Sequence, residues 1–98
     1  MTITMNRNGN ELTIAVEGRL DTMTAPELEE QLEPALEGVE KLRFDFEKLE
    51  YISSAGLRVL LTAMQIMEEQ GEITVCNVCR EVMDVFDVTG FSDDLAIE

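Results

Sequence analysis

The sequence predicts a single α/β domain with a mixed, mostly parallel sheet and helices mainly on one face of that sheet. The spacing of the apolar residues changes repeatedly between two and about 3.6, which is typical of alternating strands and helices. The expected strands alternate apolar and polar residues, which indicates a sheet covered on one face only. With 98 residues the chain is long enough for one core, so residues 1–98 are expected to form one domain.

The first two strands are expected to form an antiparallel hairpin. Ile3 and Met5 alternate with polar residues in the first strand, and apolar residues at every second position from 12 to 16 mark the next one. Between the two strands stand Asn8 and Gly9, a pair that favours a type I′ turn because both residues tolerate positive φ.

A helix is expected to follow the second strand, starting near residue 24. Thr24 has the side chain of a helix cap, Pro26 suits the first turn, and Glu27 completes a capping box. Pro34 cannot donate the helical hydrogen bond to the carbonyl four residues earlier, so the helix is expected to kink there or to end near Glu33.

The rest of the chain continues the alternation and predicts the order β-β-α-β-α-β-α-β. The expected elements are a strand at 42–46, a helix with an apolar stripe from 57 to 67 that Gly71 ends, a strand at 73–75, a helix at 82–86 with Gly90 as its left-handed cap and Phe91 folded back on Phe86, and a final edge strand at 95–97. Strands separated by helices run parallel, with right-handed crossovers.

The charge of the chain excludes some partners. Seven basic and 21 acidic residues give a formal net charge of −14, which repels nucleic acids and anionic membranes. The acidity favours a protein partner with a basic face, or it serves only to keep the domain soluble. No apolar run approaches the roughly 18 residues of a membrane-spanning helix, and residues 1–10 do not resemble a secretory signal, so a cytoplasmic location is expected.

The residues available for catalysis are few. The chain lacks histidine, the commonest general base and metal ligand. Cys76 and Cys79 form a CxxC between an expected strand and an expected helix, a position that redox-active pairs also occupy. Zinc needs four ligands, and the chain has no second cysteine pair. We therefore expect no metal, no cofactor and no enzyme activity, and we interpret the two cysteines as half-buried residues without a redox function.

Two adjacent serines, Ser53 and Ser54, stand between the expected strand at 42–46 and the helix that follows it. The ends of parallel strands are the usual place for functional residues in α/β sheets. A serine there can cap the helix, and the free amides at the helix start can equally accommodate a phosphate, so both interpretations stay open. Neither a Gly-x-Ser-x-Gly nucleophile motif nor a P-loop is present.

Four segments of the chain form one pattern. They are Ile-Ser-Ser-Ala-Gly-Leu-Arg-Val-Leu-Leu at 52–61, Gly-Arg-Leu-Asp at 18–21, the expected third strand within 42–50, and Phe-Asp-Val-Thr-Gly-Phe at 86–91. In this order and at this spacing they resemble the STAS domains, and specifically the bacterial anti-sigma factor antagonists. The resemblance runs through nearly the whole chain.

The resemblance implies a phosphorylation cycle. In this family the unphosphorylated domain binds an anti-sigma factor, often itself a serine kinase, and so frees a sigma factor. The kinase then phosphorylates the domain, and a serine phosphatase resets it. The matching acceptor is Ser54, with Ser53 in the place of the family's aspartate, and Asp21 matches the loop aspartate beside it, although on local grounds it is equally an Asx-turn residue. The residues expected to contact the partner are Asp21, Thr22, Ser53, Ala55, Gly56 and Arg58.

Two other functions fit part of the sequence. A STAS domain can also be a subunit of a lipid-transport ATPase or a stress-signalling scaffold, which binds through the same helix without the phosphorylation cycle. An acyl carrier protein is small and acidic with a serine at a helix start, but it requires Asp-Ser-Leu and an all-helical chain. The leading interpretation is an anti-sigma factor antagonist that regulates sigma-factor-dependent transcription.

Overall fold

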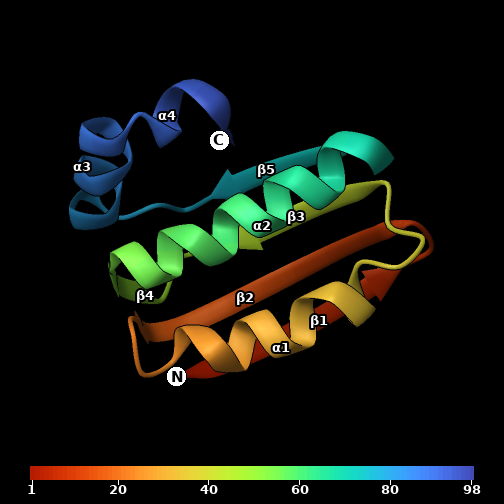
Figure 1. Cartoon of the computed structure of the whole chain (residues 1–98), viewed down its shortest axis with the longest axis horizontal. Helices are drawn as coiled ribbons and strands as arrows, with labels where there is room; N and C mark the ends of the chain where they lie inside the picture. Colours follow the sequence, from red (N-terminus) through yellow and green to blue (C-terminus); the bar gives the residue numbers. More distant parts are fainter.

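One mixed sheet of six strands, flanked by four helices, organises the chain (Figure 1). The structure is a computed structural model, and it describes all 98 residues. In chain order its elements are β1 (Thr2–Asn8), β2 (Glu11–Leu20), α1 (Ala25–Ala35), β3 (Lys41–Asp45), β4 (Leu49–Ile52), α2 (Ser54–Gln70), β5 (Glu72–Cys76), α3 (Arg80–Thr89), α4 (Phe91–Asp94) and β6 (Ala96–Ile97).

The strand order is β1-β2-β3-β5-β6, and β4 pairs with the last residues of β2. Only β1 and β2 run antiparallel, and every other pair is parallel, as the order of strands and helices in the sequence predicted. Residues 11–15 of β2 pair with β3, and residues 18–20 pair with β4, with a shift in register between Gly18 and Arg19. The long strand β2 therefore connects the body of the sheet to the edge at which β4 and α2 meet.

Helices α1 and α2 lie on the same face of the sheet, which confirms the predicted one-sided cover (Figure 1). Along β2, Leu12, Ile14 and Val16 are buried beneath these helices, whereas Thr13 and Ala15 point to the uncovered face and stay partly exposed. The core contains 23 buried apolar residues and no buried charged or polar residue. None of the helices combines the length and the apolar composition that a membrane span requires.

Helix α3 packs against β4 at one end of the sheet. A chain of aromatic rings runs from the sheet into this corner: the ring centroids of Phe46 and Phe86 are 6.5 Å apart, and those of Phe86 and Phe91 are 6.3 Å apart. Gly90 adopts the left-handed conformation (φ 84°) that lets the chain reverse and stack Phe91 on Phe86. The predicted cap, the predicted aromatic contact and the predicted final edge strand are all confirmed.

The structure contains two elements that the sequence pattern did not separate, β4 and α4. The segment expected to form one strand within 42–50 turns sharply after Asp45, whose carboxylate accepts a hydrogen bond from the Glu47 amide at 3.1 Å. The Leu49 amide closes this turn on the Phe46 carbonyl at 3.0 Å. The polar turn lets the chain leave β3 and pair again with β2, so one expected strand becomes two.

Two local expectations are corrected by the structure, and a third is nearly met. Asn8 pairs with Glu11 at the end of the hairpin, so the turn is Gly9-Asn10, and only Gly9 has a positive φ (64°), as in type II′ turns. Thr24 makes no capping bond to α1, so the predicted capping box is wrong. The helix continues one residue past Pro34 and then ends, close to the predicted stop.

Helix α2 begins in very close contact with the strands beneath it. A methyl group added at Gly56 would lie 2.7 Å from Ile52 Cγ1 and 2.8 Å from the carbonyl oxygen of Leu20. Since the Leu20 contact is with backbone, it cannot be relieved by a side-chain rotation. Only glycine at position 56 therefore allows the first turn of α2 to approach β2 and β4 this closely.

We predict that Gly56→Ala lowers the free energy of unfolding by about 1–3 kcal/mol. This sign is opposite to the usual effect within helices, where replacing glycine by alanine stabilises by about 1 kcal/mol. Thermal melting followed by circular dichroism measures the change, with the exposed Ser54→Ala as the matched control in the same helical turn. A variant that melts at or above the temperature of the wild type would contradict the close contact described above.

Candidate functional site

The pairing of β2 with β4 brings the two expected site segments together. The last residue pair is Leu20 with Ile52, and the Ser53 amide donates a hydrogen bond to the Leu20 carbonyl at 2.9 Å. Asp21 and Ser54 are the residues that immediately follow this bonded pair. The loop that begins at Asp21 and the helix that begins at Ser54 therefore start side by side, at the edge of the sheet where function was expected.

The two adjacent serines lie in different environments. Ser53 occupies the cap position of α2 with extended backbone (φ −101°, ψ 178°), and its carbonyl accepts the hydrogen bond from the Leu57 amide. Its hydroxyl oxygen is buried and has no hydrogen-bond partner, and no side chain caps the helix. Ser54 is the first residue of α2, and its side chain is exposed. The structure therefore does not support side-chain capping by these serines, and it separates an enclosed hydroxyl from an accessible one.

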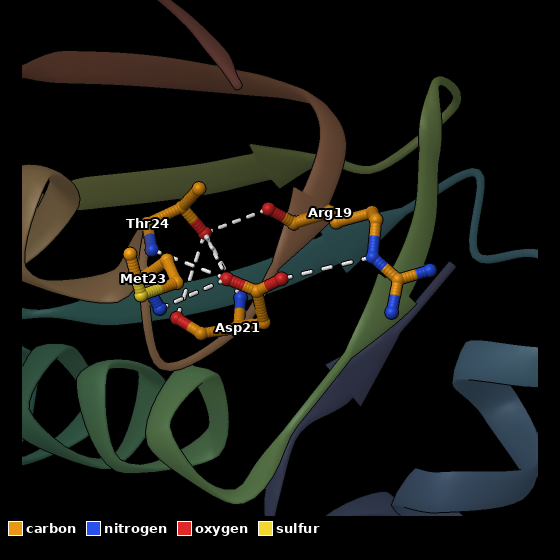
Figure 2. Close-up of polar contacts among 4 residues, drawn as sticks. All are labelled: Arg19, Asp21, Met23 and Thr24. Atoms are coloured by element: carbon orange, nitrogen blue, oxygen red, sulfur yellow. Dashed lines mark hydrogen bonds and ion pairs between the residues drawn. The ribbon is translucent and has the colours of Figure 1, made fainter.

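Asp21 organises the loop between β2 and α1 (Figure 2). Its Oδ1 accepts hydrogen bonds from the amides of Met23 at 3.0 Å and Thr24 at 3.2 Å, which is the geometry of an Asx turn. In return, the Asp21 amide donates to Thr24 Oγ1 at 2.9 Å, and that hydroxyl donates to the Arg19 carbonyl at 2.7 Å. The threonine expected to cap α1 instead closes this loop, and the turn role of Asp21 that the sequence left open is present.

The second oxygen of Asp21 faces a cation. Arg19 Nε lies 3.6 Å from Asp21 Oδ2 (Figure 2). The Arg19 guanidinium also stacks over the Tyr51 ring, at 4.2 Å from the ring centroid. Partial burial raises the pKa of Asp21, but the amides of Met23 and Thr24, the Thr24 hydroxyl and the charge of Arg19 together hold that pKa below its ordinary value. Asp21 is therefore a carboxylate at neutral pH.

The outer side of α2 forms a ridge of exposed residues that continues from Ser54. Arg58 and Leu61 follow at helical spacings of four and seven residues, and Leu61 is 43% exposed although it is apolar. In the neighbouring loop Met23 is 87% exposed, and Tyr51 on β4 is 40% exposed. Three of the four exposed large apolar residues thus belong to the elements that meet here, and the fourth, Val88, is on α3. Exposed apolar surface is typical of protein-binding sites. We name Ser54, Arg58 and Leu61 the α2 ridge.

The other residues expected to contact a partner divide between surface and interior. Thr22 and Arg58 are exposed and Ala55 is half-buried, whereas Gly56 is buried and its visible role is to let α2 pack closely. Sequence reasoning missed Arg19, Met23, Tyr51 and Leu61. Met23 was detectable as an apolar residue in an expected loop. Leu61 was expected in the apolar stripe of the helix, and its 43% exposure corrects that expectation. The contact of Arg19 with Tyr51 depends on the register of β2 with β4.

The CxxC cysteines are free thiols that lie apart from the α2 ridge. Cys76 is half-buried at the end of β5, and its burial and the nearby Asp45 carboxylate raise the pKa of its thiol. Cys79 donates a weak hydrogen bond to the Leu49 carbonyl at 3.4 Å and packs against the core. A raised thiol pKa disfavours the reactive thiolate, so this geometry does not resemble a redox-active pair. The structure contains no group of three or more Cys, Asp or Glu side chains arranged as metal ligands.

The chain belongs to the STAS domain family, whose family model matches residues 2–98. A candidate anti-sigma factor antagonist of Bordetella bronchiseptica, BtrV, is 37% identical over 93 residues, which cover 93% of this chain and 80% of that protein. The anti-sigma-B factor antagonist of Bacillus subtilis is 28% identical over 96 residues, which cover 97% of this chain and 88% of that protein. These relatives are regulatory proteins.

A solved structure has the same fold. The phosphorylated form of the Bacillus cell fate determinant SpoIIAA superimposes with a TM-score of 0.78 at 19% sequence identity, over 99% of this chain and 91% of that one. The unphosphorylated form of this anti-sigma factor antagonist gives a TM-score of 0.79 at 18% identity, over 99% of this chain and 87% of that one. At this identity the likeness establishes the fold, and it agrees with the predicted α/β architecture.

We predict that the CxxC is dispensable. Replacing Cys76 by Ser and Cys79 by Ala should change the free energy of unfolding by no more than about 1–2 kcal/mol, because the two thiols contribute only modest packing. Denaturant unfolding and a pull-down of the binding partner measure the two effects. A thiol pKa of about 6 in the wild type, together with release of the partner on oxidation, would contradict this prediction.

We predict that the turn role and the charge of Asp21 can be separated by substitution. Asp21→Asn retains an oxygen that accepts from the two amides, so it should lower the melting temperature less than Asp21→Ala does. The pKa of Asp21 is lowered by folding, so its charge stabilises the chain at neutral pH and ceases to do so as the pH falls through the lowered value.

Thermal melting at several pH values checks both expectations for Asp21. The advantage of the wild type over Asp21→Asn should shrink as the solution is acidified, because the protonated aspartate then resembles the neutral amide. If Asp21→Asn melts as low as Asp21→Ala at neutral pH, the charge and not the turn is what stabilises the loop.

Proposed function

We propose that this chain is an anti-sigma factor antagonist, which binds an anti-sigma factor while Ser54 is unmodified and is released when Ser54 is phosphorylated. The relatives named above support the class. The observation that carries the assignment to one residue is the contrast between the exposed side chain of Ser54 and the buried hydroxyl of Ser53. A kinase must reach the oxygen that it modifies, and of the two adjacent serines only Ser54 has an accessible hydroxyl.

The surroundings of Ser54 favour access by a kinase. Ala55 follows it, and Gly56 lies on the buried face of α2, so no bulky side chain from the next two positions covers the hydroxyl. Small residues let another chain approach the backbone closely. The neighbouring loop is held in one conformation by the Asp21 hydrogen bonds, so a partner meets an ordered surface.

A phosphate on Ser54 is compatible with the fold. The first turn of α2 contains no acidic residue and no side-chain cap, so its free amides have no side-chain acceptor. A negative group at this end of a helix is stabilised by about 0.3–1 kcal/mol. Modification therefore changes the surface without unfolding the domain, which is what a reversible switch requires.

The same phosphate is incompatible with docking through the α2 ridge. It adds about −1.5 to −2 charges at the start of a helix that, in the proposed complex, is covered by the partner. The free-energy cost of removing this dianion from water exceeds the favourable free energy of the contact unless the partner provides a matching cation. In the proposed cycle this chain has two partners. One is an anti-sigma factor that is a serine kinase and that releases its sigma factor, and the other is a serine phosphatase that resets Ser54.

The net charge of −14 supports a partner with a basic face. An acyl carrier protein is all-helical, so the six-stranded sheet excludes that alternative. A transporter subunit or stress-signalling scaffold would use the same fold, and the two relatives described above favour the antagonist over it.

We predict that Ser54→Asp folds like the wild type but binds the partner at least about tenfold more weakly, because it places a permanent charge in the interface. Ser54→Ala should fold, bind and never be released by ATP. The matched control is Ser92→Asp, which adds the same charge at one of the two other serines of the chain, in α4. Binding is measured by pull-down from the host lysate, with identification of the captured protein.

Phosphopeptide mass spectrometry after incubation of the captured complex with ATP locates the phosphate. We expect it on Ser54 in the wild type and in Ser53→Ala, and we expect no phosphate in Ser54→Ala. Phosphate on Ser53, or full binding by Ser54→Asp, would sink the assignment. Capture of a transporter ATPase in place of an anti-sigma kinase would favour the alternative function.

A further inference from the structure

The seven cations of the chain differ in what they already contact. Four of them form ion pairs, and these are Arg19, Lys41, Arg43 and Lys48. Arg7 donates to the carbonyls of Gly9 and Glu37. Arg58 and Arg80 make no ion pair and donate no side-chain hydrogen bond, although acidic residues outnumber basic ones by 21 to 7. One of these two free cations, Arg58, lies on the α2 ridge.

The spacing along α2 places Arg58 next to Ser54. Residues four apart in a helix lie on the same face, with their Cβ atoms about 5–6 Å from each other. Cα–Cβ bonds in a helix tilt toward its N-terminus, so a long side chain at position 58 extends back over the first turn, toward Ser54. The helix runs without interruption from Ser54 to Gln70, so both residues lie within it. An arginine in this position reaches any group attached to the hydroxyl of Ser54.

No carboxylate forms an ion pair with Arg58. The first turn of α2 holds no acidic residue, and the nearest acids along the same face, Glu68 and Glu69, lie more than two turns away. Asp21, on the loop beside the helix start, is already bonded to two amides and paired with Arg19. The guanidinium of Arg58 therefore has free N–H donors and lies close to Ser54, the proposed site of phosphorylation.

We propose that Arg58 is the intramolecular counter-ion of the phosphate on Ser54, which it binds through two parallel N–H···O bonds in the phosphorylated protein. This inference rests on the proposed function, and it adds to that function the residue that binds the phosphate once Ser54 is modified. Guanidinium and phosphate match in shape, and such charge-assisted bonds are about twice as strong as neutral ones.

This contact gives the release step a second cause. In the unmodified protein Arg58 is the cation that the α2 ridge presents to a partner. In the phosphorylated protein the same guanidinium is turned toward its own helix start. Phosphorylation thus adds a charged group to the ridge and also occupies the guanidinium donors that a partner would otherwise contact. Arg58 acts here as a positioning residue for the phosphate and takes no part in its transfer.

The test measures the second ionisation of the phosphate, whose ordinary pKa is about 6. Phosphoserine is inserted at position 54 during synthesis of the protein, so no kinase is needed, and the phosphorus NMR signal is followed as the pH changes. A neighbouring cation favours the dianion, so it lowers this pKa. We expect the pKa to be higher in Arg58→Gln than in the wild type by about 0.2–0.4, and Arg58→Lys to lie between the two.

The matched control is Arg80→Gln, which removes the other free arginine, at the start of α3. It should leave the phosphate pKa at the wild-type value, because it changes the net charge equally but lies away from Ser54. Equal pKa values in the wild type and Arg58→Gln, or equal shifts in the Arg58 and Arg80 variants, would overturn the inference. Since the phosphate is placed without a kinase, these outcomes do not depend on the binding of the Ser54 variants, and each hypothesis fails by its own measurement.

Discussion

The short pairing of β4 with the end of β2 is the interaction on which the site depends. The hydrogen bond from the Ser53 amide to the Leu20 carbonyl joins two segments that lie more than 30 residues apart in the chain. Gly56 reinforces it, because the first turn of α2 can then rest directly on the Leu20 carbonyl. Without this pairing, Asp21 and Ser54 would belong to two unrelated loops. With it, they become neighbours on one surface.

The charges are divided between the two sides of the sheet. On the uncovered side, three ion pairs cross between neighbouring segments: Lys41 with Glu11, Arg43 with Glu98, and Lys48 with Glu17. On the helical side, four glutamates of the α1 region line a groove against α2, and no cation lies among its lining residues. Four unpaired carboxylates thus lie on the side of the sheet that carries α2. A partner with a basic face would approach the molecule from there.

The buried, unpartnered hydroxyl of Ser53 shows where local rules fail. A serine before a helix normally caps it, and a threonine three residues before a glutamate normally forms a capping box. In this chain Thr24 bonds to the preceding loop, and Ser53 uses its backbone to join β2. Both departures occur at the edge where Asp21 and Ser54 meet. Because Thr24 and Ser53 make tertiary contacts at this edge, neither side chain caps its helix.

The sequence by itself determined the class of fold, the one-sided cover of the sheet and the segments that hold the site, because these follow from the periodicity of apolar residues and from a motif that is local in the chain. It did not determine that one strand divides into β3 and β4, that Gly56 packs tightly against Leu20 and Ile52, or that Arg19 stacks on Tyr51. These features depend on a register shift between distant strands. The accessibility of Ser54 over Ser53 was likewise decided only by the tertiary structure, because exposure is a property of packing and adjacent residues share the same sequence neighbourhood.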